Sequence, residues 1–335
     1  MCRRIDFIRR SGIIFMMTVL MIGLTLVGSQ NSLAQQQKSW KPAGPMTLIC
    51  YTGPGTAYDY LARQIALVLP DYLGKPVMVQ SVPGGGGGNA LDTVYHAKPD
   101  GRTFVLYGLG SQVALALEKR YKWDIKELNL ILAIDAPPYG VLASAKRSTY
   151  KDFKELMNTK ETVRIGTGGA NFVIVPLILE LEKHGVKYRV ARFKDQTGAF
   201  LAVIAGDADI TMSALSSIGL DPIRAGDFRP LWVFANKRYS ELPDVPTQVE
   251  LGMSKEWSNF NLIRLIAMPP GVPTDIQKAF TEALIKTLQD KRTLEWSKKA
   301  EIPVDIVEKK ELDERVRIVQ EGFRNNMEIV KRYFF

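Results

Sequence analysis

The sequence is poor in the side chains that most often carry out chemistry in proteins. It contains two histidines, His96 and His184, and two cysteines among 335 residues. Neither histidine has a second histidine, a cysteine or a carboxylate at metal-site spacing, and no G-x-S-x-G nucleophile elbow occurs. We therefore expect no catalytic residue, no metal, no cofactor and no enzymatic activity.

Disulfide bonding is also excluded within the mature chain that we predict. Cys2 lies in an N-terminal segment that we expect to be removed, which leaves Cys50 alone in an apolar strand. A buried, unreactive thiol is the expected state of such a residue. A chain of this length can bury a sufficient core without disulfides, even in an oxidising compartment.

Nucleotides and nucleic acids lack their usual sequence signatures here. The glycine run 84–88 is not followed by Gly-Lys-Ser/Thr, and Gly108-x-Gly110 lacks the third glycine of a dinucleotide fingerprint. The formal net charge is +9 at pH 7. The basic residues are scattered and form no aromatic-interleaved stripe, so we expect no nucleic acid partner. A mildly basic surface would still attract small anions over long range.

The first 34 residues have the pattern of a secretory signal peptide. Four arginines precede an apolar run at 13–27, and Ser32-Leu33-Ala34 places small residues at −3 and −1 of a cut before Gln35. The alternative is an uncleaved membrane anchor, but the run is shorter than the roughly 20 residues that a spanning helix needs. We predict export to the periplasm, cleavage near Ala34 and no membrane-spanning segment in the mature chain.

Apolar strands, glycine loops and amphipathic helices alternate along the mature chain, an order typical of an α/β fold with largely parallel sheets flanked by helices. The expected strands are 46–51, 77–82, 102–107, 128–134, 139–144, 163–166, 188–193, 208–212, 229–234, 261–268 and 304–307. We assign residues 40–142 and 258–335 to a first lobe and 143–257 to a second, with a ligand cleft between them.

Local signals predict where several helices begin. Thr56 and Asp59 have the spacing of a capping box, and so do Thr149 and Asp152. Pro176 lies inside a helical pattern, so we expect a kink or a late start there.

The glycine loops indicate a site for an anion. Loops after parallel strands form the crevice of an α/β sheet, and glycine lets a ligand approach the main chain closely. The helix N-termini that follow offer unsatisfied N–H groups and a partial positive charge. Two facing lobes could close around a small anion by a hinge motion, as a Venus flytrap does.

Several short motifs follow one another in an order that resembles a known family. Ile223-Arg224-Ala225-Gly226, Leu242-Pro243-Asp244-Val245-Pro246-Thr247 and Glu250-x-Gly252 form the longest stretch, and a PDG-x-T turn occurs at 99–103. In these motifs the chain resembles the periplasmic receptors of tripartite tricarboxylate transporters, also called Bug receptors. The resemblance implies a two-lobe periplasmic binding protein type II fold. It also implies a mono- or dicarboxylate ligand, held mainly by main-chain amides and ordered waters.

Three segments depart from the pattern of that family, and one of them is the second glycine loop, where Gly88 and Asn89 differ. The usual G-G-G-T-D loop reads Gly55-Thr56-Ala57-Tyr58-Asp59, which places the bulk of Tyr58 near the expected ligand. The usual Pro-Tyr-Lys-Gly strand end begins with Arg192, a candidate charge partner. The alternatives are that Asp59 only caps its helix, and that Tyr58 and Arg192 are surface residues.

The sequence thus predicts an extracytoplasmic solute-binding receptor that delivers a small organic anion to membrane transporter subunits, acting as a monomer. One alternative is a binding protein that reports its ligand to a two-component sensor, and another is an exported α/β enzyme. The residues expected to line the ligand site are Tyr51, Gly53, Gly55, Thr56, Tyr58, Asp59, Gly84, Gly85, Gly108, Gly110, Ser111, Gly168, Asn171, Phe172, Arg192 and Ser213.

Overall fold

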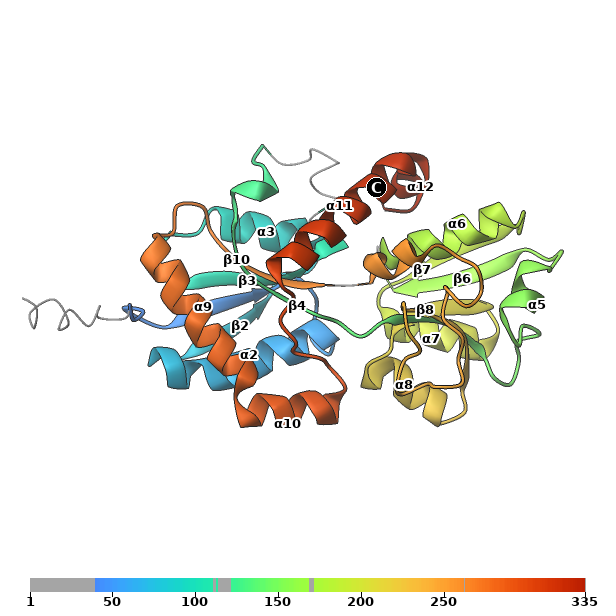
Figure 1. The fold of residues 1–335 in the computed structure, drawn as a ribbon, viewed down its shortest axis with the longest axis horizontal. Coiled ribbons are helices and arrows are strands. Elements are labelled where there is room, and N and C mark those ends of the chain that lie inside the picture. Colours follow the sequence, from blue (N-terminus) through green and yellow to red (C-terminus); the bar gives the residue numbers. More distant parts are fainter. Residues whose placement is uncertain (1–39, 111–112, 114–121, 169–171, 262, 335) are drawn as a thin grey trace, which may run out of the picture. The chain divides into compact units, whose positions relative to one another are not determined.

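Two five-stranded sheets organise the part of the chain that this computed structural model describes, residues 40–110, 113, 122–168, 172–261 and 263–334 (Figure 1). The predicted signal peptide, residues 1–34, lies outside the described residues. The strands are β1 (Met46–Cys50), β2 (Val77–Ser81), β3 (Thr103–Gly108), β4 (Asn129–Ile134), β5 (Tyr139–Ser144), β6 (Val163–Gly168), β7 (Tyr188–Phe193), β8 (Ile210–Ala214), β9 (Phe228–Phe234) and β10 (Arg264–Met268).

The two sheets have the same internal pattern. In the first, with the order β2-β1-β3-β10-β4, β1 pairs in parallel with β2 and β3, while β10 runs antiparallel to β3 and β4. In the second, with the order β7-β6-β8-β5-β9, β6 is the parallel centre and β5 is antiparallel to both neighbours. The α/β class predicted from the sequence is confirmed, although both sheets are mixed.

In each sheet, the antiparallel strand follows a strand of the other sheet in the sequence. Strand β10 follows the whole second sheet, whereas β5 arrives directly from β4 through residues 135–138. The lobe boundary that we predicted between residues 142 and 143 therefore falls inside β5. The chain passes from the first sheet to the second before that strand, not within it. The strand expected at 304–307 is present only as an isolated bridge between Ile134 and Ile306.

Helices cover both faces of each sheet (Figure 1). They are α2 (Ala57–Leu73), α3 (Gly88–Tyr95), α5 (Phe153–Met157), α6 (Val175–Lys183), α7 (Gln196–Ala205), α8 (Ser217–Arg224), α9 (Thr274–Gln289), α10 (Lys291–Ala300), α11 (Lys309–Asn325) and α12 (Met327–Phe334). Four short 3₁₀ turns are η1 (Gly85–Gly87), η2 (Ile125–Glu127), η3 (Phe172–Ile174) and η4 (Lys255–Phe260). No helix among the described residues is both long enough and apolar enough to cross a bilayer.

Adjacent strand residues show which helix covers which face of the first sheet. Phe104 contacts Phe280 of α9, with ring centroids 4.8 Å apart. The next residue, Val105, belongs to the same core cluster as Ala90 and Leu91 of α3. Because successive side chains of a strand point to opposite faces, α9 and α3 lie on opposite sides of this sheet.

The second sheet is layered in the same way. Leu142 shares a core cluster with Phe200 of α7 and Leu220 of α8. Its neighbour Val141 belongs to the other cluster, which contains Leu177 of α6. The uniformly buried strand β5 is thus sandwiched between two helical layers, which explains its unbroken apolar character.

Helix α11, the second-last helix of the chain, packs against the 3₁₀ turns η3 and η4. Phe323 lies 5.5 Å from Phe172 of η3 and 5.6 Å from Phe260 of η4, measured between ring centroids. The segment before α11 is bonded to the first sheet, since Val307 N donates to Ala133 O at 2.9 Å. The last part of the chain therefore contacts both halves of the fold.

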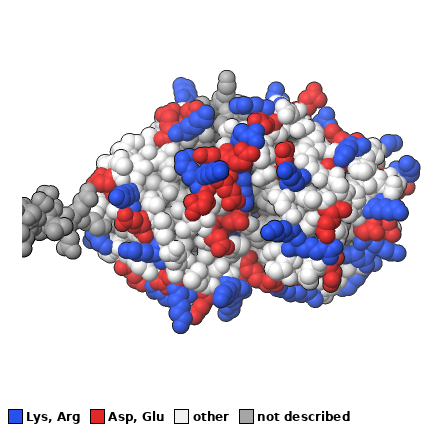
Figure 2. All heavy atoms as spheres, viewed as in Figure 1, with Lys and Arg blue, Asp and Glu red and all other residues white. Residues whose placement is uncertain are grey.

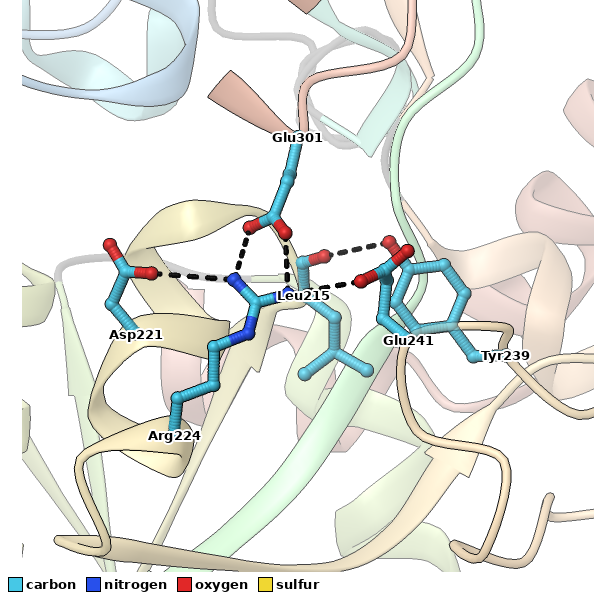
Figure 3. A network of polar contacts seen from close by, with 6 residues as sticks. All are labelled: Leu215, Asp221, Arg224, Tyr239, Glu241 and Glu301. Carbon is cyan, nitrogen blue, oxygen red and sulfur yellow. Dashed lines mark hydrogen bonds and ion pairs between the residues drawn. The ribbon is translucent and has the colours of Figure 1, made fainter. Parts of the chain in front are cut away.

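A second link between the halves is an ion-pair network centred on Arg224 of α8 (Figure 3). Its guanidinium holds the Glu301 carboxylate through two contacts, of 3.0 and 2.5 Å, and the Glu241 carboxylate through a third, of 3.0 Å. Glu301 follows α10, whose neighbours are α2 and α9 of the first sheet. Glu301 is also the only non-glycine residue of the described chain with a positive φ, 53°.

The local predictions of helix starts had mixed outcomes. Thr56 is the N-cap of α2 and accepts from Asp59 N at 3.2 Å, as expected. The Thr149 and Asp152 box is wrong, because Asp152 itself caps α5 and accepts from Glu155 N at 2.8 Å. Asp152 stands next to the first helical residue, so its carboxylate reaches the free amides of the first turn. Pro176 lies in the first turn of α6, which confirms the late start.

Candidate ligand-binding site

Parallel pairing brings three loops to one edge of each sheet. In the first sheet Cys50 is in register with Ser81 and with Leu106, so β1, β2 and β3 end side by side. In the second sheet Gly168 is in register with Phe193, and Gly166 with Thr211. The glycine loops expected to bind an anion therefore follow the carboxyl ends of neighbouring strands, as the sequence predicted.

These two carboxyl edges are joined by a very short connection. Ile134 of β4 lies at the edge of the first sheet, because it pairs with Arg264 and Arg264 pairs with Gly108. Tyr139 of β5 lies at the edge of the second, paired with Ala214. Five residue steps span at most about 17 Å, so the two edges lie within that distance of each other at this connection.

Asn261 forms hydrogen bonds with two strands of the second sheet, the start of β5 and the end of β9. Its side-chain oxygen accepts from Tyr139 N at 3.1 Å, and its side-chain nitrogen donates to Phe234 O at 2.5 Å. Two residues further on, Ile263 O accepts from Leu109 N at 2.9 Å. This region thus fixes the start of β5 and β10 against the loop that follows β3.

The first loop is a closed network of hydrogen bonds around Asp59. The Asp59 carboxylate accepts from Gly55 N and from Arg63 Nε, each at 3.0 Å. The Thr56 hydroxyl oxygen lies 2.6 Å from that of Thr52. Gly55 adopts a φ of 81°, a conformation that a residue with a Cβ atom rarely takes. These contacts hold the loop ahead of α2 in one shape.

The same network changes the acidity of Asp59. The residue is only 2% exposed, and burial alone would raise the pKa of its carboxylate. The hydrogen bonds from Arg63 and from Gly55 N outweigh burial, so the pKa of Asp59 lies below its ordinary value. Asp59 is therefore ionised and holds the loop before α2 through Gly55 N, not the Thr56 N of the expected capping box, which is consistent with a structural role.

Two tyrosines stand together beside the end of β3. The rings of Tyr51 and Tyr58 meet edge to face with centroids 4.7 Å apart. A Cβ atom at Gly108 would lie 2.9 Å from each of their hydroxyl oxygens, so only glycine leaves room for both. Tyr58 is 4% exposed and is therefore not the surface aromatic of the alternative interpretation. Its hydroxyl group lies beside that of Tyr51, with which it interacts.

A buried arginine completes this cluster. Arg264 is 2% exposed, and its Cζ atom lies 5.8 Å from the centroid of the Tyr58 ring. Its Nη1 donates to the main-chain oxygens of Asp135 at 2.6 Å and Pro303 at 3.0 Å, while its Nε is buried without a partner among the described residues. Burial lowers the pKa of this guanidinium, but an arginine remains charged at neutral pH.

The phenols around Arg264 remain protonated at neutral pH. Burial raises the pKa of Tyr58 to about 12, against the opposing influence of the Arg264 charge. Burial and the neighbouring Tyr58 raise the pKa of Tyr139 well above its ordinary value. A protonated phenol can donate a hydrogen bond to an anion, so the first edge offers uncharged donors around one fixed positive charge.

The second edge is assembled by close contact of main chains. A Cβ atom at Gly168 would lie only 2.4 Å from Gln196 N, at the start of α7. Asp195 caps that helix through a 3.0 Å bond from Gly198 N. The side-chain amide nitrogen of Gln196 donates to Thr211 Oγ1 at 3.1 Å. The predicted importance of Gly168 thus has a steric cause, since any other residue would separate β6 from α7.

Hydroxyl groups are the other feature of the second edge. Ser213 is buried and its hydroxyl donates to Ala214 O at 3.2 Å. The hydroxyl oxygens of Thr167 and Ser216 are buried and have no partner among the described residues. They lie at the end of β6 and at the N-cap of α8, where a ligand or a water molecule could supply the missing bond.

One direct contact joins the predicted residues of the two edges. A Cβ atom at Gly110 would lie 3.4 Å from the Cβ atom of Phe172, so the loop after β3 touches the loop after β6. Phe172 is 8% exposed and faces Phe323 of α11. Ser111 and Asn171, which were predicted beside these two residues, lie outside the described residues.

The described structure shows no contact of three groups of predicted residues with the cluster of Tyr51, Tyr58 and Arg264. Arg192 is exposed, and its Nη2 donates to Arg332 O of α12 at 3.5 Å. Gly84 and Gly85 are exposed in a left-handed turn after β2, with φ values of 110° and 58°. Gly53 has open space where a side chain would point.

Sequence reasoning missed Arg264, Tyr139 and Gln196. Arg264 stands among apolar residues in an expected strand, and an isolated charge in such a run is itself a signal of a buried functional group. Nothing local distinguishes Tyr139 or Gln196. Within the described residues, no three His, Cys, Asp or Glu side chains are arranged to hold a metal ion. Cys50 is free and buried, as predicted.

Comparisons with known proteins agree with the predicted family. The sequence model of the tripartite tricarboxylate transporter family receptor matches residues 61–333. A UPF0065 protein of Bordetella pertussis is 30% identical over 253 residues, which cover 72% of this chain and 76% of that protein.

Solved structures show the same fold. The periplasmic binding protein BugD superposes with a TM-score of 0.70 at 20% identity, covering 87% of this chain and 98% of BugD. MatC of Rhodopseudomonas palustris, solved with bound malate, superposes with a TM-score of 0.68 at 22% identity, covering 85% of this chain and 98% of MatC.

Proposed function

We propose, because this chain belongs to the tripartite tricarboxylate transporter receptor family, that it captures a small mono- or dicarboxylate and delivers it to membrane transporter subunits. The family is one of solute-binding receptors, and its solved relatives include periplasmic binding proteins. The site that we propose lies between the carboxyl edges of the two sheets, and the sheets with their covering helices form the two lobes.

The observation that carries this proposal is the short connection 135–138, which begins and ends at those two edges. Each edge presents loops that precede helix N-termini, and each contains buried polar atoms without partners among the described residues, such as Arg264 Nε and Ser216 Oγ. A carboxylate could accept from such groups and from the main-chain N–H groups of the loops. The binding of malate by the related protein MatC is consistent with this ligand class.

The distribution of charge supports attraction of anions only in a general way. Basic and acidic side chains are interspersed over the face seen in Figure 2, with no large patch of one sign. Without the predicted signal peptide, which holds four arginines and one aspartate, the net charge is +6, and long-range attraction would raise the rate of anion capture modestly. Affinity would then depend on the site itself, not on the surface.

Thermal unfolding against a panel of acids tests the proposal. The panel contains acetate, benzoate, malate, succinate, adipate and citrate. We expect at least one acid to raise the melting temperature, because a ligand at a hundredfold excess over its Kd stabilises the folded state by about 2.7 kcal/mol. For a chain of this size that corresponds to several degrees. If no acid in the panel shifts the melting temperature, the proposed ligand class is wrong.

Two controls make the result specific. The uncharged diamides of malate and succinate should give no shift, and an acid that binds should be recovered chemically unchanged after incubation, as expected of a receptor. Replacing Gly53 by leucine should remove binding without unfolding the protein, because a Cβ atom at this position would meet nothing within 4 Å. Retained binding in G53L would show that the first loop does not face the ligand.

A further inference from the structure

Arg264 is a buried positive charge without an acidic partner. The residue is 2% exposed, and no carboxylate of the described residues forms a hydrogen bond or ion pair with its guanidinium. Its bonds go to two main-chain oxygens, which carry only partial charge. The nearby Asp135 carboxylate is instead paired with Arg315, at 3.3 Å. A charge removed from water without an opposite charge is costly, and proteins retain one mainly where a ligand or partner completes it.

The surroundings of Arg264 include two main-chain acceptors and the hydroxyl groups of neighbouring tyrosines, but no paired carboxylate among the described residues. Arg264 and Gly108 are directly opposed on antiparallel strands, so both face the same side of the first sheet. On that side the Tyr51 and Tyr58 hydroxyl oxygens occupy the space where a side chain at residue 108 would lie. The hydroxyl of Tyr58 is buried, and the group beside it is the hydroxyl of Tyr51.

The cluster lies at the carboxyl edge of the first sheet, where Arg264 is paired with Gly108 and Ile134. Tyr51 is partly exposed, whereas Tyr58, Tyr139 and Arg264 are buried behind it. Tyr51 follows the carboxyl end of β1, and Tyr139 begins the strand that enters the second sheet. The buried charge is therefore located where the two carboxyl edges meet.

We propose that Arg264, together with the hydroxyl groups of Tyr51 and Tyr58, receives one carboxylate group of the ligand. This inference rests on the proposed function, because it assigns a charge partner within the same site. It means that recognition at the first edge is ionic, whereas main-chain amides and neutral hydroxyls bind the remainder of the ligand at the second edge. A molecule lacking any carboxylate would leave the buried charge uncompensated and would be rejected.

Calorimetric titration of the purified protein with malate, succinate and adipate tests the inference. In the variant Arg264→Met, the Kd of each acid that binds the wild type should rise by about tenfold to a hundredfold, as expected for loss of hydrogen bonds to a charged group. Arg264→Lys keeps the charge but not the forked guanidinium donors. Its Kd should therefore lie between that of the wild type and that of Arg264→Met. Tyr58→Phe should raise the Kd by about threefold to tenfold.

Arg315→Met is the matched control. It removes the same charge beside the same residue, Asp135, but Arg315 is already paired with Asp135 and Glu311 and belongs to α11. Its Kd values should stay within about twofold of the wild type. An equal loss of affinity in Arg315→Met and Arg264→Met would overturn the inference in favour of general charge attraction.

The outcomes separate this inference from the proposed function. If the wild type binds none of the three acids and none of the wider panel, the proposed function fails and the inference with it. If the wild type binds an acid and Arg264→Met binds it equally well, only the inference fails. Should Arg264→Met not fold, Tyr58→Phe decides, because it removes a single hydroxyl whose neighbour in the cluster is the hydroxyl of Tyr51. Unchanged affinity there would contradict the role of the cluster.

Discussion

The two sheets have one strand order but build their carboxyl edges in different ways. At the first edge, large side chains fill the space, namely Tyr51, Tyr58 and Arg264 beside the glycine of residue 108. At the second edge, main chains approach each other directly, with Gly168 against the start of α7. The same arrangement of strands and helices can therefore present a buried charge on one side and neutral amides and hydroxyls on the other.

This difference teaches that the fold determines where a ligand meets the protein, whereas individual residues determine the chemistry of the contact. Strand register alone places Gly108 and Gly168 at the ends of β3 and β6. The absence of a side chain serves opposite purposes at the two positions. At Gly108 it admits side chains from elsewhere, and at Gly168 it admits another main chain.

The largest effect should come from adding a methyl group at the second edge. In Gly168→Ala the new Cβ atom would lie 2.4 Å from Gln196 N, and main-chain atoms there cannot rotate away. We expect the free energy of unfolding, measured in urea, to fall by about 1–3 kcal/mol or more. Gly53→Ala at the first edge is the control and should stay near the wild-type value, since nothing lies within 4 Å. Equal stability of both variants would show that the two edges do not differ in how tightly their main chains are packed.

A somewhat smaller effect is expected at Asp59, which stabilises the first loop as an anion. Asp59→Asn should lower the free energy of unfolding at pH 7 by about 1–3 kcal/mol, because the bonds to Arg63 and Gly55 N are charge-assisted.

The pH dependence sharpens that prediction. Because the pKa of Asp59 is lowered in the folded state, its contribution is fully present above the unfolded-state pKa of about 4. It is lost as the pH falls through the lower folded-state pKa. The difference between wild type and Asp59→Asn should therefore shrink below about pH 4 in urea titrations. Asp195→Asn at the second edge should change stability little, since asparagine caps a helix as well as aspartate does. A constant difference between wild type and Asp59→Asn at all pH values would contradict the ionised role of Asp59.

Helix caps allow the two edges to be compared at equal chemistry. Thr56→Ala and Asp195→Ala each remove the side chain that bonds a free amide in the first turn, of α2 and α7 respectively. Each should lower the free energy of unfolding by about 1 kcal/mol. Thr56 also contacts Thr52 at 2.6 Å, so we expect its loss to be the larger of the two. The reverse order in a thermal melt would show that the second edge is the more rigid one.

The smallest effect is expected from the network in Figure 3. Glu301→Gln weakens the only pair of this network that joins α8 to the end of α10, whereas Glu241→Gln weakens a pair within the second half. Because the Arg224 side chain is 47% exposed, each change should lower stability by less than about 1 kcal/mol, and less still at high salt. Only Glu301→Gln should alter ligand affinity, which calorimetry would detect. Equal affinities in both variants would show that this link does not influence binding.

Much of the fold could be predicted because its signals are local. The first three strands and the helices between them follow from apolar runs broken by glycine. The left-handed helix ends at Gly74 and Gly206, with φ values of 74° and 89°, are typical of glycine at the end of a helix. The glycine loops were correctly predicted at the carboxyl ends of strands. The sheet to which β5 belongs could not be predicted, because a strand buried on both faces looks the same in either sheet.

The amino-acid sequence by itself determined the alternation of strands and helices, the glycine turns and the family of the protein, since these depend on residues near one another in the chain. Only the tertiary structure decided that Arg264 lies opposite Gly108 and over Tyr58, and that Gly168 meets Gln196. Those contacts join residues that are distant in sequence, and they arise from strand register and packing, which no local pattern specifies.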